Sequence, residues 1–407
     1  MTMTTSTSET EAVHSSTRSA APLIVLTAPF GQEAQGSLDE TLAHLESAWP
    51  GESILVATAG DVTSTQPSAS TFGPRLVTYA QPRVSAAAPL LTAANFIMAA
   101  ELVKELNTPT CLMLGAEAQT VTPEVLRAFA NALSQEAVDL ALPCYHLGSR
   151  DGLVNTAMLY PLTRALYGAS PRFPLATDLG LSARNLQRLA LSARKFIHAD
   201  QEDALLWPVA EAAAANFSIV EVDAPGRILT QPAAPDLNAL LSHVLGSLFA
   251  DIEARAAHWQ RTRIAKPQTP VFLHPSTEPE HDAASLVSAF QLAYYNLQEI
   301  WAIVLPPTSL LGLKRLAQLS PADFVMPDSL WARIVYDFIL AYHMRIINRG
   351  HLLGALTPLY LAWVVSHFNI TAKQSSPMAH REAVAVAFEA DKSYLVSRWR
   401  SPDRFNP

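Results

Sequence analysis

The stretch from Pro143 to Ser182 combines the residue types that bind polar substrates. Aromatic side chains alternate there with charged and amide groups, which is unusual for a plain hydrophobic core: Tyr145, Tyr160, Tyr167 and Phe173 among His146, Arg150, Asp151, Asn155, Arg164, Arg172 and Asp178. A turn at Ser149–Gly152 leads into a helix expected over Leu153–Tyr167, and Gly168 is well placed to end it. Two prolines then hold the chain extended. A polar extended segment between helices is a common place for substrate binding.

Three motifs in this stretch carry a resemblance to a known family. They are Asp151-Gly-Leu-Val-Asn155, Tyr160-Pro-Leu-Thr-Arg-Ala-Leu-Tyr-Gly168 and Arg172-Phe-Pro-Leu-Ala-Thr-Asp178-Leu-Gly-Leu-Ser182. In this order they resemble the middle block of family-two-like glycosyltransferases, the nucleotide-sugar enzymes of the mannosylglycerate and glucosyl-phosphoglycerate synthase type. One departure matters. Ala176-Thr177 replaces the glycines that the family has before the acid, which makes the loop bulkier.

The resemblance implies roles for several side chains. Asp178 would position the acceptor or the transferred sugar, with Asp203 near it, and the transfer would retain the configuration of the anomeric carbon. Tyr145, Arg172 and Arg184 would bind the acceptor. Two of these residues also have ordinary interpretations, since Asp203 stands where an acid caps a helix and Arg184 lies on a helix face that water could cover.

The loops after the first two expected strands are where the family holds its nucleotide. Pro29 and Phe30 match the start of the family's Pro-x-Tyr-Asn-Glu-Glu loop, and Glu33 would accept the ribose hydroxyls. A solvated loop acid is the alternative for Glu33. The family has an Asp-Gly-Ser turn after its second strand that contacts the base. Asp61 lies within a residue or two of the matching position in this chain. These four residues are therefore expected on the donor side of the site.

The metal motif of the family is altered in this chain. Relatives have Leu-Asp-Ala-Asp-Leu where this chain has Leu114-Gly-Ala-Glu-Ala118, so Gly115 removes one carboxylate and Glu117 keeps the other on a longer arm. Leu229 stands where relatives place a histidine. The family's hard divalent cation bridges the donor diphosphate. We therefore expect weak or absent affinity for magnesium or manganese, with Glu117 the remaining ligand and a bound nucleoside diphosphate as the way to rescue it.

Two interpretations of the altered site remain open. Arg227, with Ala116 and Glu117 at the donor side, could hold the diphosphate without a metal, since arginine is always charged and binds phosphate through two hydrogen bonds. Alternatively, the site has lost transfer activity. The sequence thus predicts a glycosyltransferase that moves a sugar from a nucleotide donor to a small, glycerate-like acceptor, or a non-catalytic relative that binds a sugar nucleotide or a protein.

The elements that must position these residues follow an α/β pattern. From Pro22 short apolar runs alternate with amphipathic segments, which predicts a mostly parallel sheet with helices on both faces; the family's name for such a fold is GT-A. Ligands on such sheets bind at the carboxyl ends of the strands. The expected organisation is a disordered tail over 1–21, the α/β domain over 22–260, a proline-rich linker over 261–281 and an all-helical region over 282–407.

Composition narrows the class of protein. The 407 residues are 49% hydrophobic and 16% charged, which supports a large core, and the net charge of −8 argues against nucleic acid as a partner and fits a cytoplasmic enzyme. Two cysteines form neither a disulfide framework nor a zinc site. The apolar run Leu352–Val365 is short for a membrane span and contains Pro358, so a buried helix or helix pair is expected. The helical region is the expected surface for a homodimer.

Overall fold

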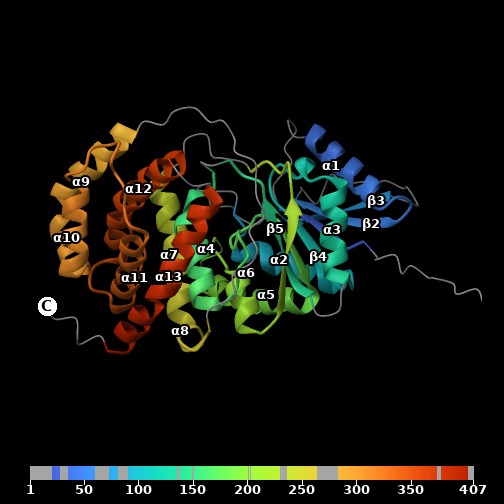
Figure 1. Ribbon diagram of the computed structural model, residues 1–407. Coiled ribbons are helices and arrows are strands. Elements are labelled where there is room, and N and C mark those ends of the chain that lie inside the picture. Colours follow the sequence, from blue (N-terminus) through green and yellow to red (C-terminus); the bar gives the residue numbers. More distant parts are fainter. Residues whose placement is uncertain are drawn as a thin grey trace, which may run out of the picture.

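The computed structural model describes residues 21–27, 35–59, 73–80, 90–134, 138–148, 151–199, 201, 203–229, 236–263, 283–373 and 377–401. A seven-stranded sheet with its covering helices forms one part of the molecule, and a group of helices forms the other beside it (Figure 1). Each part has its own cluster of buried apolar side chains. The α/β fold class and the helical C-terminal region predicted from the sequence are both confirmed.

The sheet has the order β3-β2-β1-β4-β6-β5-β7. Its strands are β1 Leu23–Leu26, β2 Ser53–Ala59, β3 Gly73–Tyr79, β4 Thr110–Leu114, β5 Val138–Tyr145, β6 Leu179–Ser182 and β7 Ser218–Ala224. β1 pairs in parallel with β4, with Leu23 opposite Cys111, which fits the mostly parallel sheet predicted from the sequence. β6 differs from the prediction, because it is antiparallel to both β4 and β5 and comes from the segment expected only to be extended.

Helices cover both faces of the sheet. They are α1 Gln35–Ala48, α2 Ala93–Glu105, α3 Pro123–Ser134, α5 Ala183–Ile197 and α6 Pro208–Ala214. Ser182 caps α5, since its side chain accepts a hydrogen bond from the Asn185 backbone N–H at 3.3 Å. The inner strands are buried on both faces, which explains their continuous apolar sequences.

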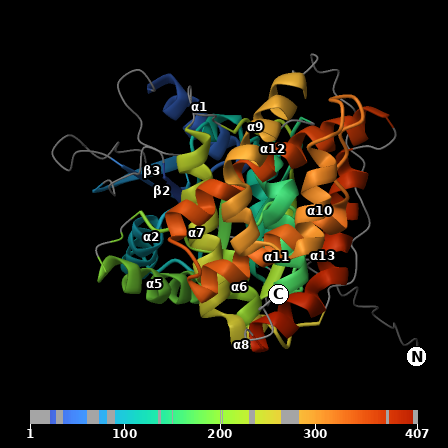
Figure 2. The same cartoon turned by 90° about the vertical axis from the view of Figure 1, so that its left-hand side faces the viewer.

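The other part of the molecule is helical (Figure 2). It contains α7 Leu237–Ala254, α8 Ala256–Trp259, α9 Ala283–Val304, α10 Pro307–Leu316, α11 Asp328–Met344, α12 Arg349–Lys373 and α13 Pro377–Arg400. α12 continues through Pro358 as one helix. Its Arg349–Ala372 stretch is, among the described residues, the one helix long and apolar enough to cross a membrane, but 67% of the tested window is buried inside the protein. That burial is typical of a core helix.

The helix predicted over Leu153–Tyr167 joins the two parts. It contains two π-helical segments, η3 Asn155–Leu159 and η4 Thr163–Tyr167, on either side of the short α4 Tyr160–Leu162. Pro161 has no N–H, so the Ala157 carbonyl lacks its α-helical donor. Trp331 of α11 supplies one, with its Nε1 donating to that carbonyl at 2.8 Å. The segment therefore packs into the core of the helical part, although the sequence assigns it to the α/β domain. The predicted domain boundaries stay a prediction.

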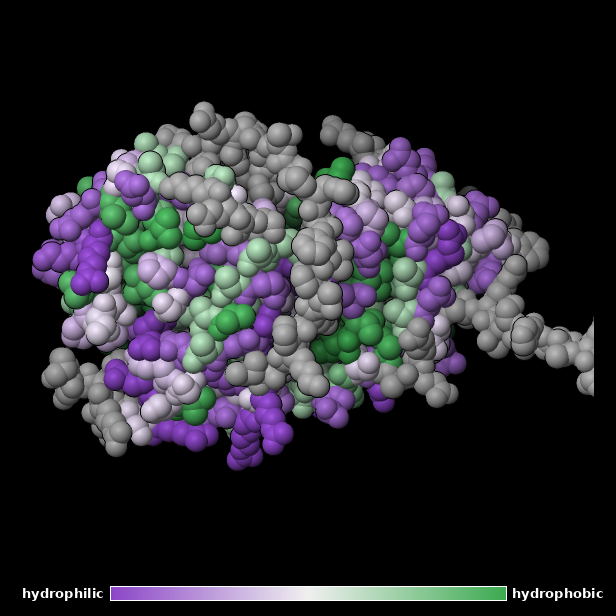
Figure 3. Space-filling view, viewed as in Figure 1, coloured by the Kyte–Doolittle hydropathy of each residue, from purple (hydrophilic) through white to green (hydrophobic). Residues whose placement is uncertain are grey.

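Apolar side chains remain exposed on the helical part. Leu292, Tyr295 and Ile303 of α9 and Leu311 of α10 are each at least half exposed. Figure 3 shows hydrophobic residues gathered over this end of the molecule. The homodimer through the helical region stays a prediction. These exposed apolar residues are where its interface is expected.

We expect stability to depend on pH through Asp337 of α11. Burial is the largest cause that raises the pKa of this carboxyl, to about 7, and its Oδ2 has no hydrogen-bond partner in the described chain. A raised pKa means that the folded state binds the carboxyl proton more tightly than the unfolded state does. The resulting stability is fully present below the unfolded pKa and is lost as the pH rises through the folded pKa. Asp337→Asn should therefore become more stable than the wild type above pH 7, by up to about 4 kcal/mol.

The measurement is urea denaturation of both proteins at pH 4.5, 6 and 8. Asp39→Asn on the exposed face of α1 is the control and should show no such pH trend. An equal difference between wild type and Asp337→Asn at all three pH values would contradict the prediction.

Candidate functional site

Asp178 lies at the carboxyl edge of the sheet, where the parallel strands end. It directly precedes β6, whose first residue pairs with Met113 near the end of β4. Its side chain is 2% exposed. Oδ1 accepts the Gly115 backbone N–H at 2.9 Å, and Oδ2 accepts the Tyr145 hydroxyl at 2.8 Å. Burial, followed by the Asp178 charge, raises the pKa of Tyr145 well above its usual value, so this phenol stays protonated and donates.

Arg227 is the counter-charge of the Asp178 carboxylate. It follows the turn after β7, and its Nε and Nη2 donate to the two oxygens of Asp178 at 2.9 and 3.0 Å. The remaining hydrogen bonds of the guanidinium go to oxygens of the neighbouring loops: the carbonyls of Ala116, Glu117 and Ile228 and the hydroxyl of Thr120. Each guanidinium nitrogen is thus already engaged. The prediction that Arg227 binds a diphosphate requires these bonds to break first.

Thr177 fills the space above Gly115. A Cβ added to Gly115 would lie 2.8 Å from the Thr177 Cβ and 3.1 Å from its Oγ1, closer than side chains pack. The two departures from the family, Gly115 and Ala176-Thr177, are therefore coupled, because the threonine stands where a carboxylate at position 115 would project. A Gly115→Asp substitution alone cannot restore an acidic ligand without moving Thr177.

We expect Gly115→Ala to destabilise the fold because of this contact. The free energy of unfolding should fall by about 1–3 kcal/mol, as for overpacking elsewhere. In a Thr177→Gly background the same substitution should cost clearly less. Denaturant unfolding of the four proteins of this cycle measures the coupling. Gly36→Ala is the control, because its added Cβ has no neighbour within 4 Å, and additive effects of Gly115→Ala and Thr177→Gly would refute the coupling.

Glu117 is poorly supported as a metal ligand. It has a left-handed backbone, with φ of 58°, and its carboxylate accepts a hydrogen bond from the Gln119 amide at 2.6 Å. Leu229, in the position of the family's histidine, packs against the apolar core of the sheet. Among the described residues, no group of three or more histidine, cysteine, aspartate or glutamate side chains is arranged to hold a metal. The residues present thus do not fit the family's divalent cation.

The three predicted acceptor ligands lie in different places. Tyr145 contacts Asp178, as described. Arg172 is buried, with its Nη1 2.7 Å from Cys144 Sγ. Arg184 lies at the opposite edge of the sheet, at the start of α5, where its guanidinium binds the carboxylate of Asp139. The predicted grouping of Arg184 with Asp178 must therefore be corrected, since the length of β6 separates them.

The pair formed by Asp139 and Arg184 is structural. Burial acts to raise the pKa of Asp139, but hydrogen bonds from Arg184, Ser182 and the Ser218 N–H outweigh it and hold the pKa below its usual value. Arg188, one turn further along α5, binds Glu211. These contacts do not support the prediction that Arg184 binds the acceptor, because both arginines already have carboxylate partners.

The remaining predicted residues are Asp203, the donor-side residues and Ala116. Asp203 is exposed, next to Ala204, whose carbonyl accepts the Ala93 N–H at the start of α2. Its predicted catalytic role stays a prediction. The donor-side residues Pro29, Phe30, Glu33 and Asp61 lie outside the described residues. Ala116 is present at the site through its carbonyl, which binds Arg227.

A histidine–aspartate pair at the same edge was not predicted as a site. His146 directly follows β5, and its Nε2 lies 2.5 Å from Oδ1 of Asp223 in β7. The sequence signal was present, because His146 stands in the polar stretch, but its partner is 77 positions away in the sequence. Such a pair can act as a general base, since the carboxylate orients the imidazole.

No family model matches the chain, and none of the curated proteins matches it. Solved structures do. Glucosyl-3-phosphoglycerate synthase from Mycobacterium tuberculosis, in complex with Mn2+, UDP and phosphoglyceric acid, aligns with a TM-score of 0.35 and 16% identity over 56% of this chain and 78% of that chain. The same enzyme with Mn2+, UDP-glucose and phosphoglyceric acid aligns with a TM-score of 0.35 and 14% identity over 56% and 79%. This synthase is of the type that the sequence motifs resemble.

Proposed function

We propose that this protein binds a sugar nucleotide at the carboxyl edge of its sheet and does so without a divalent cation. The observation that carries the proposal is the buried pair of Asp178 and Arg227, joined by two hydrogen bonds. Burial acts to lower the pKa of Arg227, but the Asp178 carboxylate outweighs it and raises that pKa, so the guanidinium is a permanent cation. The charge of Asp178 is thus neutralised by a side chain of the protein itself.

The same edge of the sheet offers a polar atom to a ligand. Thr58 lies near the end of β2 and is 7% exposed, and its Oγ1 has no hydrogen-bond partner in the described chain. A buried hydroxyl without a partner is uncommon, because it costs free energy unless a ligand or water satisfies it. Thr58 of β2 and Asp178, just before β6, lie at the same end of the parallel strands, which is where ligands bind on such sheets. The unpaired Thr58 hydroxyl and its place at the carboxyl ends of the strands both support a polar ligand at this edge.

The test is calorimetric titration with a panel of nucleotide sugars, including UDP-glucose, with and without manganese. We expect binding that manganese does not strengthen, and no release of nucleotide over hours. Thr58→Val, which keeps the shape of the side chain, should weaken binding by roughly tenfold, the usual cost of one hydrogen bond. The absence of binding to every donor in the panel, or binding only with manganese, would overturn the proposal.

A second candidate is transfer of the sugar to a small, glycerate-like acceptor without a metal. The observation that favours it is the pair of His146 and Asp223, because its imidazole is about one third exposed and could take a proton from an acceptor hydroxyl. Nucleotide release that requires an added acceptor would support this candidate. His146→Gln should then lose turnover while it keeps donor binding, and Asp223→Asn should show the same separation. Equal turnover in the wild type and His146→Gln would exclude the role.

A further inference from the structure

A second polar cluster lies on the other face of the same two strands. In the parallel register of β5 and β7, Leu142 lies beside Glu221 and Cys144 lies beside Asp223. Side chains alternate between the faces of a strand, so these residues lie on the face opposite to Tyr145 and the Asp178 pair. The cluster is therefore separate from the Asp178–Arg227 pair, although it borders Asp223 of the His146 pair and contains Arg172, which the resemblance assigns to the acceptor.

Arg172 lies on this opposite face. Its backbone N–H donates to Oε1 of Glu221 at 2.6 Å, while its Nε is 3.6 Å from Oε2, longer than a hydrogen bond. Its Nη1 contacts the thiol sulfur of Cys144, which is only a weak acceptor. Burial raises the pKa of that thiol to about 11, so the sulfur is neutral. Arg172 thus has one carboxylate partner, and the geometry of that pair is poor.

Arg381 of α13 reaches the cluster from the helical part. Arg381 is 7% exposed, and its guanidinium carbon lies 5.2 Å from the centre of the Tyr160 ring. Its Nε has no hydrogen-bond partner in the described chain, and the Glu382 carboxylate is 3.9 Å away. That carboxylate is already bound by Arg164 and by the Tyr160 hydroxyl. Among the described residues, Nε of Arg381 is therefore a buried donor without a hydrogen-bond partner.

Burial of charged groups is the main electrostatic cost in this cluster. It raises the pKa of Glu221, although the charges of Arg172 and Arg381 act to lower it. Burial is also the largest cause that lowers the pKa of Arg381, and the nearby charge of Arg172 acts in the same direction. Arg381 bears this cost without a hydrogen bond to its Nε among the described residues. A buried cation without hydrogen bonds is costly, and an oxyanion between the two arginines would remove that cost.

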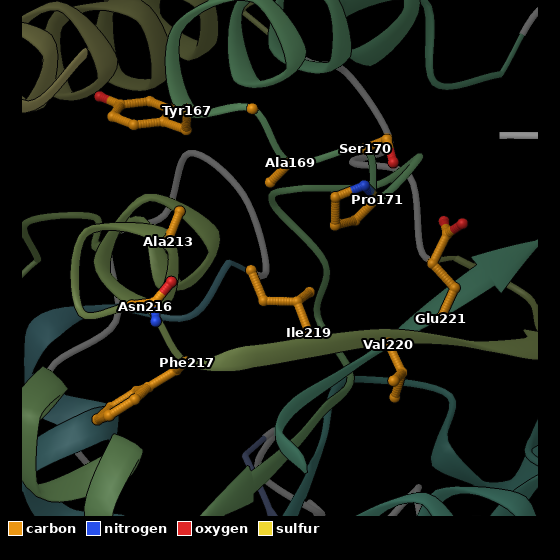
Figure 4. A pocket seen from close by; sticks show the side chains of 11 residues that line it. Tyr167, Ala169, Ser170, Pro171, Ala213, Asn216, Phe217, Ile219, Val220 and Glu221 are labelled. Carbon is orange, nitrogen blue, oxygen red and sulfur yellow. The ribbon is translucent and has the colours of Figure 1, made fainter. Parts of the chain in front are cut away.

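We propose that Arg172 and Arg381 form a binding site for a small oxyanion, either a carboxylate or a phosphate. A pocket of about 320 Å³ lies next to this position, between Tyr167–Pro171 and the outer edge of β7. Figure 4 shows the Glu221 carboxylate at one end of the pocket, directed toward Ser170 and Pro171. Pro171 precedes Arg172, so a small anion that enters this pocket reaches the arginines by displacing the Glu221 side chain.

The experiment is calorimetric titration of the full chain with inorganic phosphate and, separately, with glycerate, at constant ionic strength set with sodium chloride. We expect at least one of them to bind, and the comparison identifies the preferred oxyanion. Arg381→Gln should weaken binding by roughly 10- to 100-fold, the usual effect of losing charged hydrogen bonds. Arg381→Lys, which keeps the charge, should bind with intermediate affinity and covers the case in which the glutamine variant does not fold.

Arg349→Gln is the matched control. Arg349 is also an arginine of the helical part, but it binds Glu253 at 2.7 Å and stacks on Tyr342. Its substitution should leave anion affinity unchanged, and the bound anion should raise the melting temperature of this variant as it does for the wild type. The proposal is overturned if neither anion binds the wild type, if Arg381→Gln and Arg381→Lys both bind like the wild type, or if Arg349→Gln weakens binding equally.

Discussion

Replacing Arg227 by methionine is expected to lower the free energy of unfolding by about 3–5 kcal/mol. The substitution keeps much of the side-chain volume but leaves the Asp178 carboxylate buried with no counter-charge. The carbonyls of Ala116 and Glu117 lose their donor as well. Removing one partner of a buried ion pair is costly because the other charge has been taken out of water. Urea denaturation monitored by circular dichroism measures the change.

A second substitution at Asp178 separates the charge from the packing. Arg227→Met combined with Asp178→Asn should lose less stability than Arg227→Met alone, because a neutral amide replaces the unpaired carboxylate. The Tyr145 hydroxyl can still donate to the asparagine oxygen. If Arg227→Met alone costs less than about 1 kcal/mol, the pair is not the rigid centre on which the proposed metal-free site depends.

A comparable loss, again about 3–5 kcal/mol, is expected for Arg164→Met. Arg164 is 1% exposed and lies in the segment between the two parts of the molecule. Its guanidinium donates to Glu382 at 2.5 Å and to both oxygens of Glu389 at 2.7 and 3.0 Å. Both acids belong to α13, so one arginine fastens the C-terminal helix to the segment that joins the two parts of the molecule. The variant should unfold at lower urea concentration, with the helical part separating first.

Arg333→Met provides the control for this prediction. It breaks a similar pair with Asp391, but Arg333 is about one third exposed, and such pairs are worth roughly 1 kcal/mol or less. Adding Glu382→Gln and Glu389→Gln to Arg164→Met should recover part of the lost stability, since it removes the two unpaired charges. Equal effects of Arg164→Met and Arg333→Met would show that burial of Arg164 does not matter to stability.

The π-helical segment illustrates the limits of reading a site from composition. Arg164 and Tyr160 stand in the polar, aromatic stretch that suggests substrate binding, yet their partners are acids of α13 more than 200 positions later. The sequence shows which residues are polar. It does not show which of them will be satisfied by other parts of the chain, because ion pairs over such separations form only when the fold brings the helices together.

The sequence by itself determined the alternation of strands and helices, the mostly parallel sheet, the helical C-terminal part and the loss of a carboxylate at Gly115. These follow from local chemistry, namely hydrophobic periodicity, turn residues and the identity of one side chain. The tertiary structure alone decided that β6 enters the sheet antiparallel, that Thr177 fills the space above Gly115, and that Arg227 reaches Asp178 while Arg184 faces the opposite edge. The physical reason is that strand direction and register set which edge a side chain reaches, and both depend on contacts between distant segments.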